Sequence, residues 1–126
     1  MTVIKVAVAP DPSSLRDARH TLRERLGRLG LAEPLIDALE GVANELLGAA
    51  FESGVVGSLV LRVEMFARLT SLRVRCPSRV VLRDEPFGMR ERVLQGLAFA
   101  WGERSYSDGS VDLWAEVAVP LATVGR

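Results

Sequence analysis

Apolar residues recur every three or four positions in three stretches of the chain, which is the spacing of one helix face. These stretches are residues 12–30, 34–54 and 87–101. The first follows Asp11, a capping side chain, and closes at Gly30, a residue that commonly ends helices. We therefore predict three helices, with inward residues Leu15, Ala18, Leu22, Leu26 and Leu29 in the first, Leu35, Leu39, Val42, Ala43, Leu46, Leu47 and Ala50 in the second, and Met89, Val93, Leu94, Leu97, Ala98 and Trp101 in the third.

Alternation of apolar and polar residues, weak in the first case, marks the segments outside these helices as strands. Residues 3–9 are rich in β-branched side chains and predict a first strand. Residues 59–66 and 71–76 alternate on either side of a short turn, so they predict a hairpin with one buried and one polar face. Cys76 falls on the buried face of that hairpin.

The C-terminal part of the chain predicts a second hairpin. A strand is expected around Tyr106, Asp108-Gly109 is a strong turn signal, and residues 111–119 alternate again. The predicted order is strand, two helices, two strands, helix and two strands. Three helices can cover only one face of a sheet of about five strands, so we expect an α+β two-layer sandwich with a mixed, mostly antiparallel sheet. We expect residues 1–126 to form a single domain.

Composition narrows the function classes. Sixteen basic and sixteen acidic residues give a net charge of zero, which argues against a nucleic-acid partner. One cysteine, Cys76, and one histidine, His20, exclude an internal disulfide and a zinc cluster of thiolates. No apolar run approaches the roughly 20 residues that span a bilayer, and the first strand is no signal peptide. We therefore expect no membrane partner and a cytoplasmic location. His20 is off the apolar stripe of its helix, so we expect it to be exposed.

Three phrases, together with the order of elements, carry a resemblance to a known family. They are ANELLGAA at residues 43–50, LRVRCP at 72–77 and VDLWAEV at 111–117. The chain resembles, over about residues 12–118, stand-alone histidine-kinase-like ATPase (GHKL) domains with the Bergerat fold, and among them the anti-sigma-factor serine-kinase type. The resemblance implies a bacterial regulator of transcription that holds a sigma factor away from RNA polymerase until an antagonist competes, and that commonly forms a homodimer.

Members of that family bind ATP with magnesium through three motifs, of which the first lies on the second helix. It has a glutamate that polarises the group meeting the terminal phosphate, and four residues later an asparagine that coordinates magnesium. Glu45 matches the glutamate, but Ala49 stands at the asparagine position and its methyl group coordinates nothing. Asn44 lies about 100° around the helix from Glu45, so it does not take over the role. Glu45 could equally be an ordinary solvated helix residue.

The other two motifs depart from the family pattern as well. Cys76 stands where an aspartate accepts a hydrogen bond from adenine, and Ser78 where a glycine follows. A thiol is a poor acceptor, so Cys76 fits a small buried hydrophobe better. Gly88 matches the first glycine of the phosphate-binding turn, or it is simply a helix-start glycine. Met89-Arg90-Glu91 replaces the rest of that turn, and Arg90 would fill the space of the phosphates.

These departures give three hypotheses for the function. The first is a non-catalytic, partner-switching regulator, anti-sigma-like or an antagonist of one, with a degraded nucleotide site and no cofactor. The second is an active ATP-dependent serine kinase with a diverged pocket, which alone would need ATP and magnesium. The third is a plain α+β interaction domain. We expect the first, so we expect no catalytic residue, with Glu45 the one retained candidate.

A binding surface is expected on the polar side of the strands. Trp114, Arg62, Arg73 and Arg75 fall on comparable faces of neighbouring strands, and tryptophan and arginine are enriched at binding hot spots. Glu64, Asp112 and Glu116 lie among them. The alternative is a solvated face with cross-strand ion pairs, each worth about 0.2–1 kcal/mol. Such a face would suit a homodimer or a separate protein partner.

Overall fold

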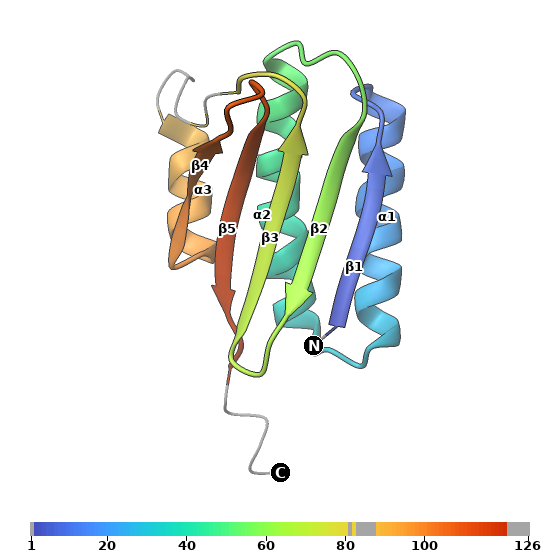
Figure 1. The fold of residues 1–126 in the computed structure, drawn as a ribbon. Helices are drawn as coiled ribbons and strands as arrows, with labels where there is room; N and C mark the ends of the chain where they lie inside the picture. The colour runs from blue at the N-terminus through green and yellow to red at the C-terminus, as the bar shows by residue number, and fades with distance from the viewer. Residues whose placement is uncertain (1, 81, 83–87, 121–126) are drawn as a thin grey trace.

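The computed structural model describes residues 2–80, 82 and 88–120 of the chain. Its elements follow the predicted order (Figure 1): β1 (Thr2–Val8), α1 (Pro12–Arg28), α2 (Glu33–Glu52), β2 (Leu59–Met65), β3 (Leu69–Cys76), α3 (Met89–Leu97), β4 (Ala100–Ser105) and β5 (Val111–Ala118).

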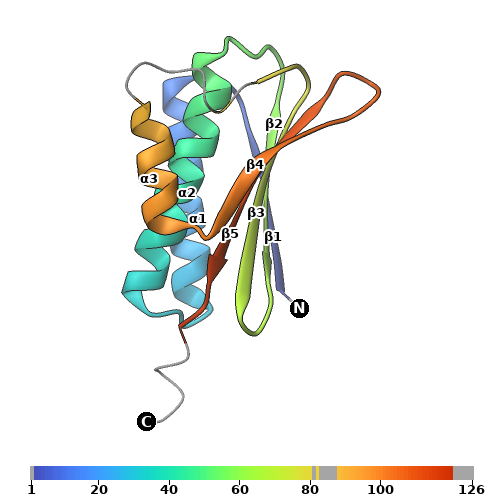
Figure 2. The same ribbon diagram turned by 90° about the vertical axis from the view of Figure 1, so that its left-hand side faces the viewer.

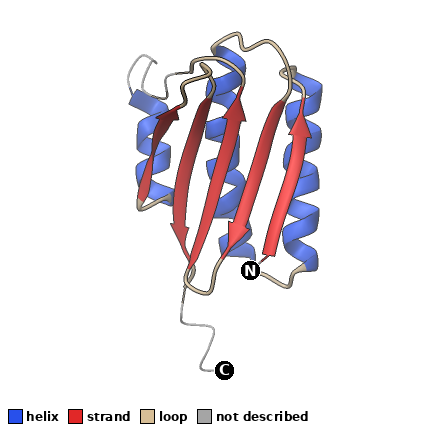
Figure 3. Ribbon diagram, in the orientation of Figure 1, coloured by secondary structure: helices blue, strands red, loops and turns tan. Residues whose placement is uncertain are grey.

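The strands form one five-stranded sheet in the order β1-β2-β3-β5-β4 (Figure 3). All four pairings of neighbouring strands are antiparallel, so the described sheet lacks the parallel component that we allowed for. The three helices lie side by side on one face of this sheet (Figure 2). The predicted α+β two-layer sandwich is therefore confirmed, and no helix of the described residues covers the opposite face of the sheet, called here the open face.

The core lies between the two layers. The apolar stripe predicted on α2 is buried along its whole length, and Ala18, Leu22 and Leu26 of α1 are buried beside it. Leu29, predicted to point inward, is instead 44% exposed, because the helix ends one residue before it. The fully buried large side chains of the core come from both layers and include Leu22, Leu26, Ile36, Leu39, Leu46, Leu59, Leu61, Leu72 and Leu113.

The start of α1 and the end of α2 follow the signals in the sequence. Asp11 accepts a hydrogen bond of 2.8 Å from the backbone N–H of Ser14, which caps α1. Gly54 follows the end of α2 at a φ of 72°, a left-handed conformation that glycine adopts without strain. His20 is exposed on α1, as expected.

The third helix is shorter than predicted. The predicted start, Phe87, lies outside the described residues, and α3 ends at Leu97 rather than at Trp101. Trp101 belongs to the edge strand β4, and the backbone N–H of Phe99 already donates to the carbonyl of Glu116 in β5. Pairing with β5 thus overrides helical spacing after Leu97.

The prediction that Met89 and Val93 lie on the inward face of this helix was also wrong. Met89 is 56% exposed and Val93 is 36% exposed, whereas Leu94 is fully buried. The hairpin that follows turns at Asp108-Gly109, as predicted: Gly109 has a φ of 89°, and the N–H of Tyr106 donates to the carbonyl of Ser110. Tyr106 itself lies one residue beyond β4.

Candidate functional site

Arg90 connects the two helices on which the resemblance places a nucleotide site. Its Nε lies 3.4 Å from a carboxylate oxygen of Glu45, and a terminal nitrogen donates to the carboxylate of Glu52 at 3.0 Å. The Arg90 side chain is 7% exposed, whereas those of Glu45 and Glu52 are 19% and 62% exposed. A buried cation of α3 is therefore held by two carboxylates of α2.

The geometry of α2 explains how this cation fits. Glu45, Gly48 and Glu52 are spaced three and four residues apart, so they lie in one row along the helix. A β-carbon at Gly48 would lie 3.5 Å from a terminal nitrogen of Arg90, so the guanidinium packs directly over the bare backbone there. Glu45 and Arg90 belong to separate motifs in the sequence, and Gly48 and Glu52 complete the row of α2 that contacts Arg90.

Ala49 and Asn44 lie on other sides of the same helix. Ala49 is 2% exposed and belongs to the hydrophobic core. Asn44 is exposed and accepts a hydrogen bond of 2.9 Å from Arg19 of α1. Asn44 thus contacts α1 while Glu45 contacts α3, which agrees with the angle between them that the helix geometry requires.

Cys76 ends β3 with its thiol fully buried, which confirms the prediction of a small buried hydrophobe. Burial raises the pKa of this thiol to about 12; the charge of Asp112 raises it as well, and that of Arg75 lowers it. The thiol is therefore protonated and unreactive at neutral pH. Ser78, two residues on, is exposed.

Gly88 is the residue directly before α3 and has a φ of 60°, in the left-handed region. A residue with a β-carbon would be strained in this conformation, which accounts for glycine at the position. Among the residues that the structure describes, no three histidine, cysteine, aspartate or glutamate side chains gather to form a metal site.

The four candidate interface residues share the open face, as predicted. Arg62 and Arg73 stand opposite each other on β2 and β3, and both donate to the carboxylate of Glu64, at 2.7 and 2.9 Å. The hydrogen bond from Arg62 lowers the pKa of Glu64, burial opposes the shift, and the charge of Arg73 adds to it. Glu64 is therefore already neutralised by two arginines of its own sheet.

Asp112 is the centre of a second cluster on this face. Its side chain is 5% exposed and accepts hydrogen bonds from Arg75, at 2.5 and 3.3 Å, and from the Tyr106 hydroxyl, at 2.7 Å. The Arg75 guanidinium also lies 4.3 Å from the centre of the Tyr106 ring. Burial alone would raise the pKa of Asp112, but the hydrogen bonds from Arg75 and Tyr106 outweigh it and leave the pKa lowered.

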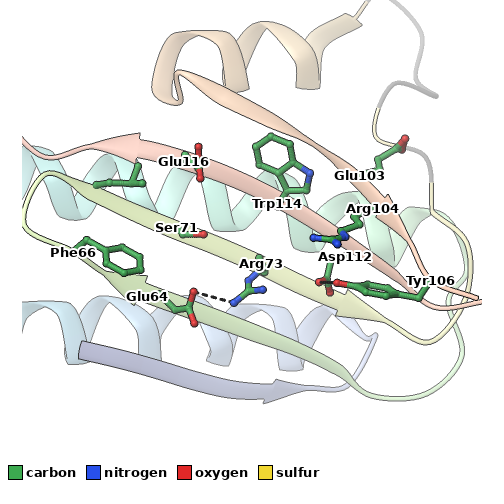
Figure 4. A pocket seen from close by; sticks show the side chains of 11 residues that line it. Glu64, Phe66, Ser71, Arg73, Glu103, Arg104, Tyr106, Asp112, Trp114 and Glu116 are labelled. Carbon is green, nitrogen blue, oxygen red and sulfur yellow. Dashed lines mark hydrogen bonds and ion pairs between the residues drawn. The ribbon is translucent and has the colours of Figure 1, made fainter. Parts of the chain in front are cut away.

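The open face is hollowed between these clusters. A concavity of about 580 Å³ extends from Phe66 and Glu116 at one end to Tyr106 and Asp112 at the other (Figure 4). Trp114 lies along it, next to Gly102 of β4, where a β-carbon would come within 3.1 Å of the indole. Tyr106 and Gly102 could not be assigned to this surface from the sequence, because hairpin pairing and a turn bring them there.

No family model matches the chain, and neither does any curated protein. Among solved structures, the chain is similar to the crystal structure of the RsbU and RsbW domains of Rv1364c from Mycobacterium tuberculosis, with a TM-score of 0.72 and 13% sequence identity. The match covers 95% of this chain and 33% of that one, so the chain spans about a third of the length of its structural neighbour. At this identity the likeness shows a shared fold.

No helix among the described residues combines the length and the apolar character needed to cross a membrane.

Proposed function

We propose that the protein is a non-catalytic regulatory binding protein, a partner-switching component of the anti-sigma type that does not use ATP. The observation that carries this proposal is the position of Arg90 between Glu45 and Glu52. In the family that the chain resembles, the same helix surface serves magnesium and the phosphates. Here a cation of the protein itself occupies the carboxylate that such chemistry would need.

The residues around Arg90 do not suit magnesium and ATP. Magnesium needs oxygen ligands, and Ala49 has none to offer where the family places an asparagine. Glu45 could act on a terminal phosphate only after releasing Arg90, which is almost wholly buried. Releasing it would leave two glutamates facing a polyphosphate, which repel it. We therefore derive no catalytic step for Glu45.

A regulatory role is supported by the fold and by the open face. The fold is shared with a structure that contains an RsbW domain, and the sequence resembles anti-sigma-factor kinases. The open face offers tryptophan, tyrosine and arginine side chains, the types that contribute most at protein interfaces. We propose that the partner is a protein, either a sigma factor or an antagonist of an anti-sigma factor, and that the protein forms a homodimer.

Titration calorimetry with magnesium-ATP tests the loss of the nucleotide site. We expect no saturable binding by the wild-type protein at ATP concentrations up to about 1 mM, the range in which working enzymes bind their substrates. The Glu45→Gln variant is a matched control, because it keeps the shape of the side chain and removes its charge. Micromolar binding by the wild type would contradict the loss of the nucleotide site. Turnover of that ATP, abolished in Glu45→Gln, would support the active serine kinase instead.

Co-purification from the source cells tests the regulatory role. We expect a sigma factor or an antagonist of one to be recovered at a stoichiometry near one to one, identified by mass spectrometry. Recovery of neither, with the purified protein still folded, would favour the plain interaction domain.

A further inference from the structure

The outward residues of β5 differ in what stands beside them on the neighbouring strands. Asp112 is flanked by Arg75 of β3 and Arg104 of β4. Glu116, at the other end of the hollow, is flanked by Ser71 of β3 and Ala100 of β4. One carboxylate thus has an arginine on each side, and the other has only small neighbours.

The Asp112 end shows what this surface does with a guanidinium. Arg75 pairs with the carboxylate through two nitrogens and lies 4.3 Å from the centre of the Tyr106 ring. Arginine suits such a site better than lysine, because its planar group can bind a carboxylate and stack on a ring at the same time. A carboxylate, an aromatic ring and an arginine therefore form one complete set of interacting groups at this end of the hollow.

The Glu116 end has the first two members of the same set. Trp114 lies two residues from Glu116 on the same face of β5, a separation of about 7 Å along a strand. Glu116 is partly buried in the hollow, and within the described residues its carboxylate takes part in no hydrogen bond or ion pair. Glu64, the nearest other carboxylate across Ser71, already holds Arg62 and Arg73.

We infer that the Glu116 end of the open face binds an arginine side chain of a separate protein partner, which supplies the missing cation. The guanidinium pairs with Glu116 and stacks on the Trp114 indole, in the space that Ser71 leaves open. The indole packs against the backbone of Gly102, where no side chain intervenes, and this contact fixes its position. The inference rests on the proposed binding role and names the chemistry by which the partner is recognised.

The experiment is an NMR titration of the ¹⁵N-labelled protein with the peptide acetyl-Gly-Arg-Gly-amide at low salt. We expect saturable shifts of the Trp114 indole N–H and of the backbone amides of Ser71 and Glu116, with a dissociation constant on the order of millimolar. The Trp114→Phe variant assigns the indole signal. The matched peptide with citrulline in place of arginine has the same shape without the charge, and we expect it to bind at least about fivefold more weakly.

Two variants test the site from opposite directions. Glu116→Gln removes the carboxylate and should weaken binding of the arginine peptide about fivefold. Ser71→Arg places an arginine of the sheet itself beside Glu116, as Arg75 lies beside Asp112. This arginine should occupy the carboxylate and abolish the peptide-induced shifts. Glu24→Gln, on the exposed side of α1, should bind like the wild type.

Several outcomes would overturn the inference. Equal binding of the citrulline peptide, undiminished binding by Glu116→Gln, or no shifts at all would each do so. A wild-type dimer that Glu116→Gln dissociates in sedimentation would identify a second copy as the occupant, against our choice of a separate partner. If the arginine peptide does not bind, the proposed function still stands as long as ATP does not bind and a regulatory partner co-purifies. Micromolar ATP binding, in contrast, contradicts the proposed function without affecting the peptide result.

Discussion

On the face of the sheet that the helices cover, Leu61, Leu72 and Leu113 are fully buried. The residues that follow two of them, Arg73 and Trp114, point the other way and line the hollow of the open face. Since side chains alternate along a strand, the same strands build both surfaces. The covered face consists almost wholly of apolar contacts, and the open face of arginine, carboxylate and aromatic groups.

The two faces also place their charges differently. Beside the covered face, Arg90 is a buried cation whose partners reach it from more exposed positions. On the open face, Asp112 is the buried member and Arg75, 48% exposed, is the accessible one. A partner can therefore reach the cations of the open face, while the cation between α2 and α3 is sealed within the fold. This difference separates stability from recognition and can be tested residue by residue.

The largest effect is expected from the covered face. Leu113→Ala should lower the free energy of unfolding by about 3–4 kcal/mol, because it removes a fully buried side chain and leaves a cavity in a packed layer. Urea denaturation followed by circular dichroism measures the change. Glu116→Gln, three residues along the same strand on the open face, is the control and should change stability by less than about 0.5 kcal/mol. Similar losses in both variants would contradict the division of roles.

A smaller loss is expected for Arg90→Ala, about 2 kcal/mol. The variant removes the buried stem of the side chain and takes away the cation that pairs with Glu45 and Glu52. Arg92→Ala, an exposed arginine on the same helix, is the matched control and should stay within about 0.5 kcal/mol of the wild type. Equal stability of the two variants in urea would mean that the row of Glu45, Gly48 and Glu52 does not fix α3.

Arg75→Ala should lower the free energy of unfolding the least of the three at neutral pH, by about 1 kcal/mol, because the arginine is half exposed. In the wild type the pKa of Asp112 is lowered, so its contribution to stability is present above the unfolded-state pKa of about 3.9 and is lost as pH falls through the folded-state pKa. Without Arg75, the effect of burial on that carboxyl is opposed only by the Tyr106 hydrogen bond and the charge of Arg73, so we expect its pKa to rise.

The pH dependence therefore distinguishes this variant from a simple loss of packing. A carboxyl with a raised pKa gains stability on acidification, so the difference between Arg75→Ala and the wild type should narrow as pH falls from 7 to about 4. Urea titrations at several pH values measure it. A difference that stays constant over this range would show that Arg75 does not hold the charge of Asp112.

The layered fold could be predicted because strict alternation leaves little choice of face. The hairpin of β2 and β3 follows directly from it, and the stripe on α2 follows in the same way from the helical spacing of its apolar residues. The end of α3 could not be predicted, because apolar residues continue at helical spacing to Trp101. Only the pairing of β4 with β5 ends the helix before that residue. Local patterns thus fixed the elements, while a contact between distant segments decided one boundary.

The candidate sites were predicted less completely, for a similar reason. The sequence identified Glu45 as the retained motif residue and Arg90 as a departure, but their contact spans 45 positions of chain and depends on how α3 lies against α2. Tyr106 was expected in a strand and instead follows one, where it reaches Asp112 across the hairpin. The spacing of Glu45, Gly48 and Glu52 in one helical row was the one local signal that could have pointed to the buried cation.

The burial of Cys76 has a practical consequence. It is the only cysteine of the chain, its thiol is fully enclosed, and its pKa is raised to about 12. Thiol-directed reagents react with the thiolate, so the native protein offers them almost nothing at neutral pH. A variant such as Ser71→Cys would therefore carry one addressable thiol on the open face, and a dye or spin label attached there would report on that surface alone.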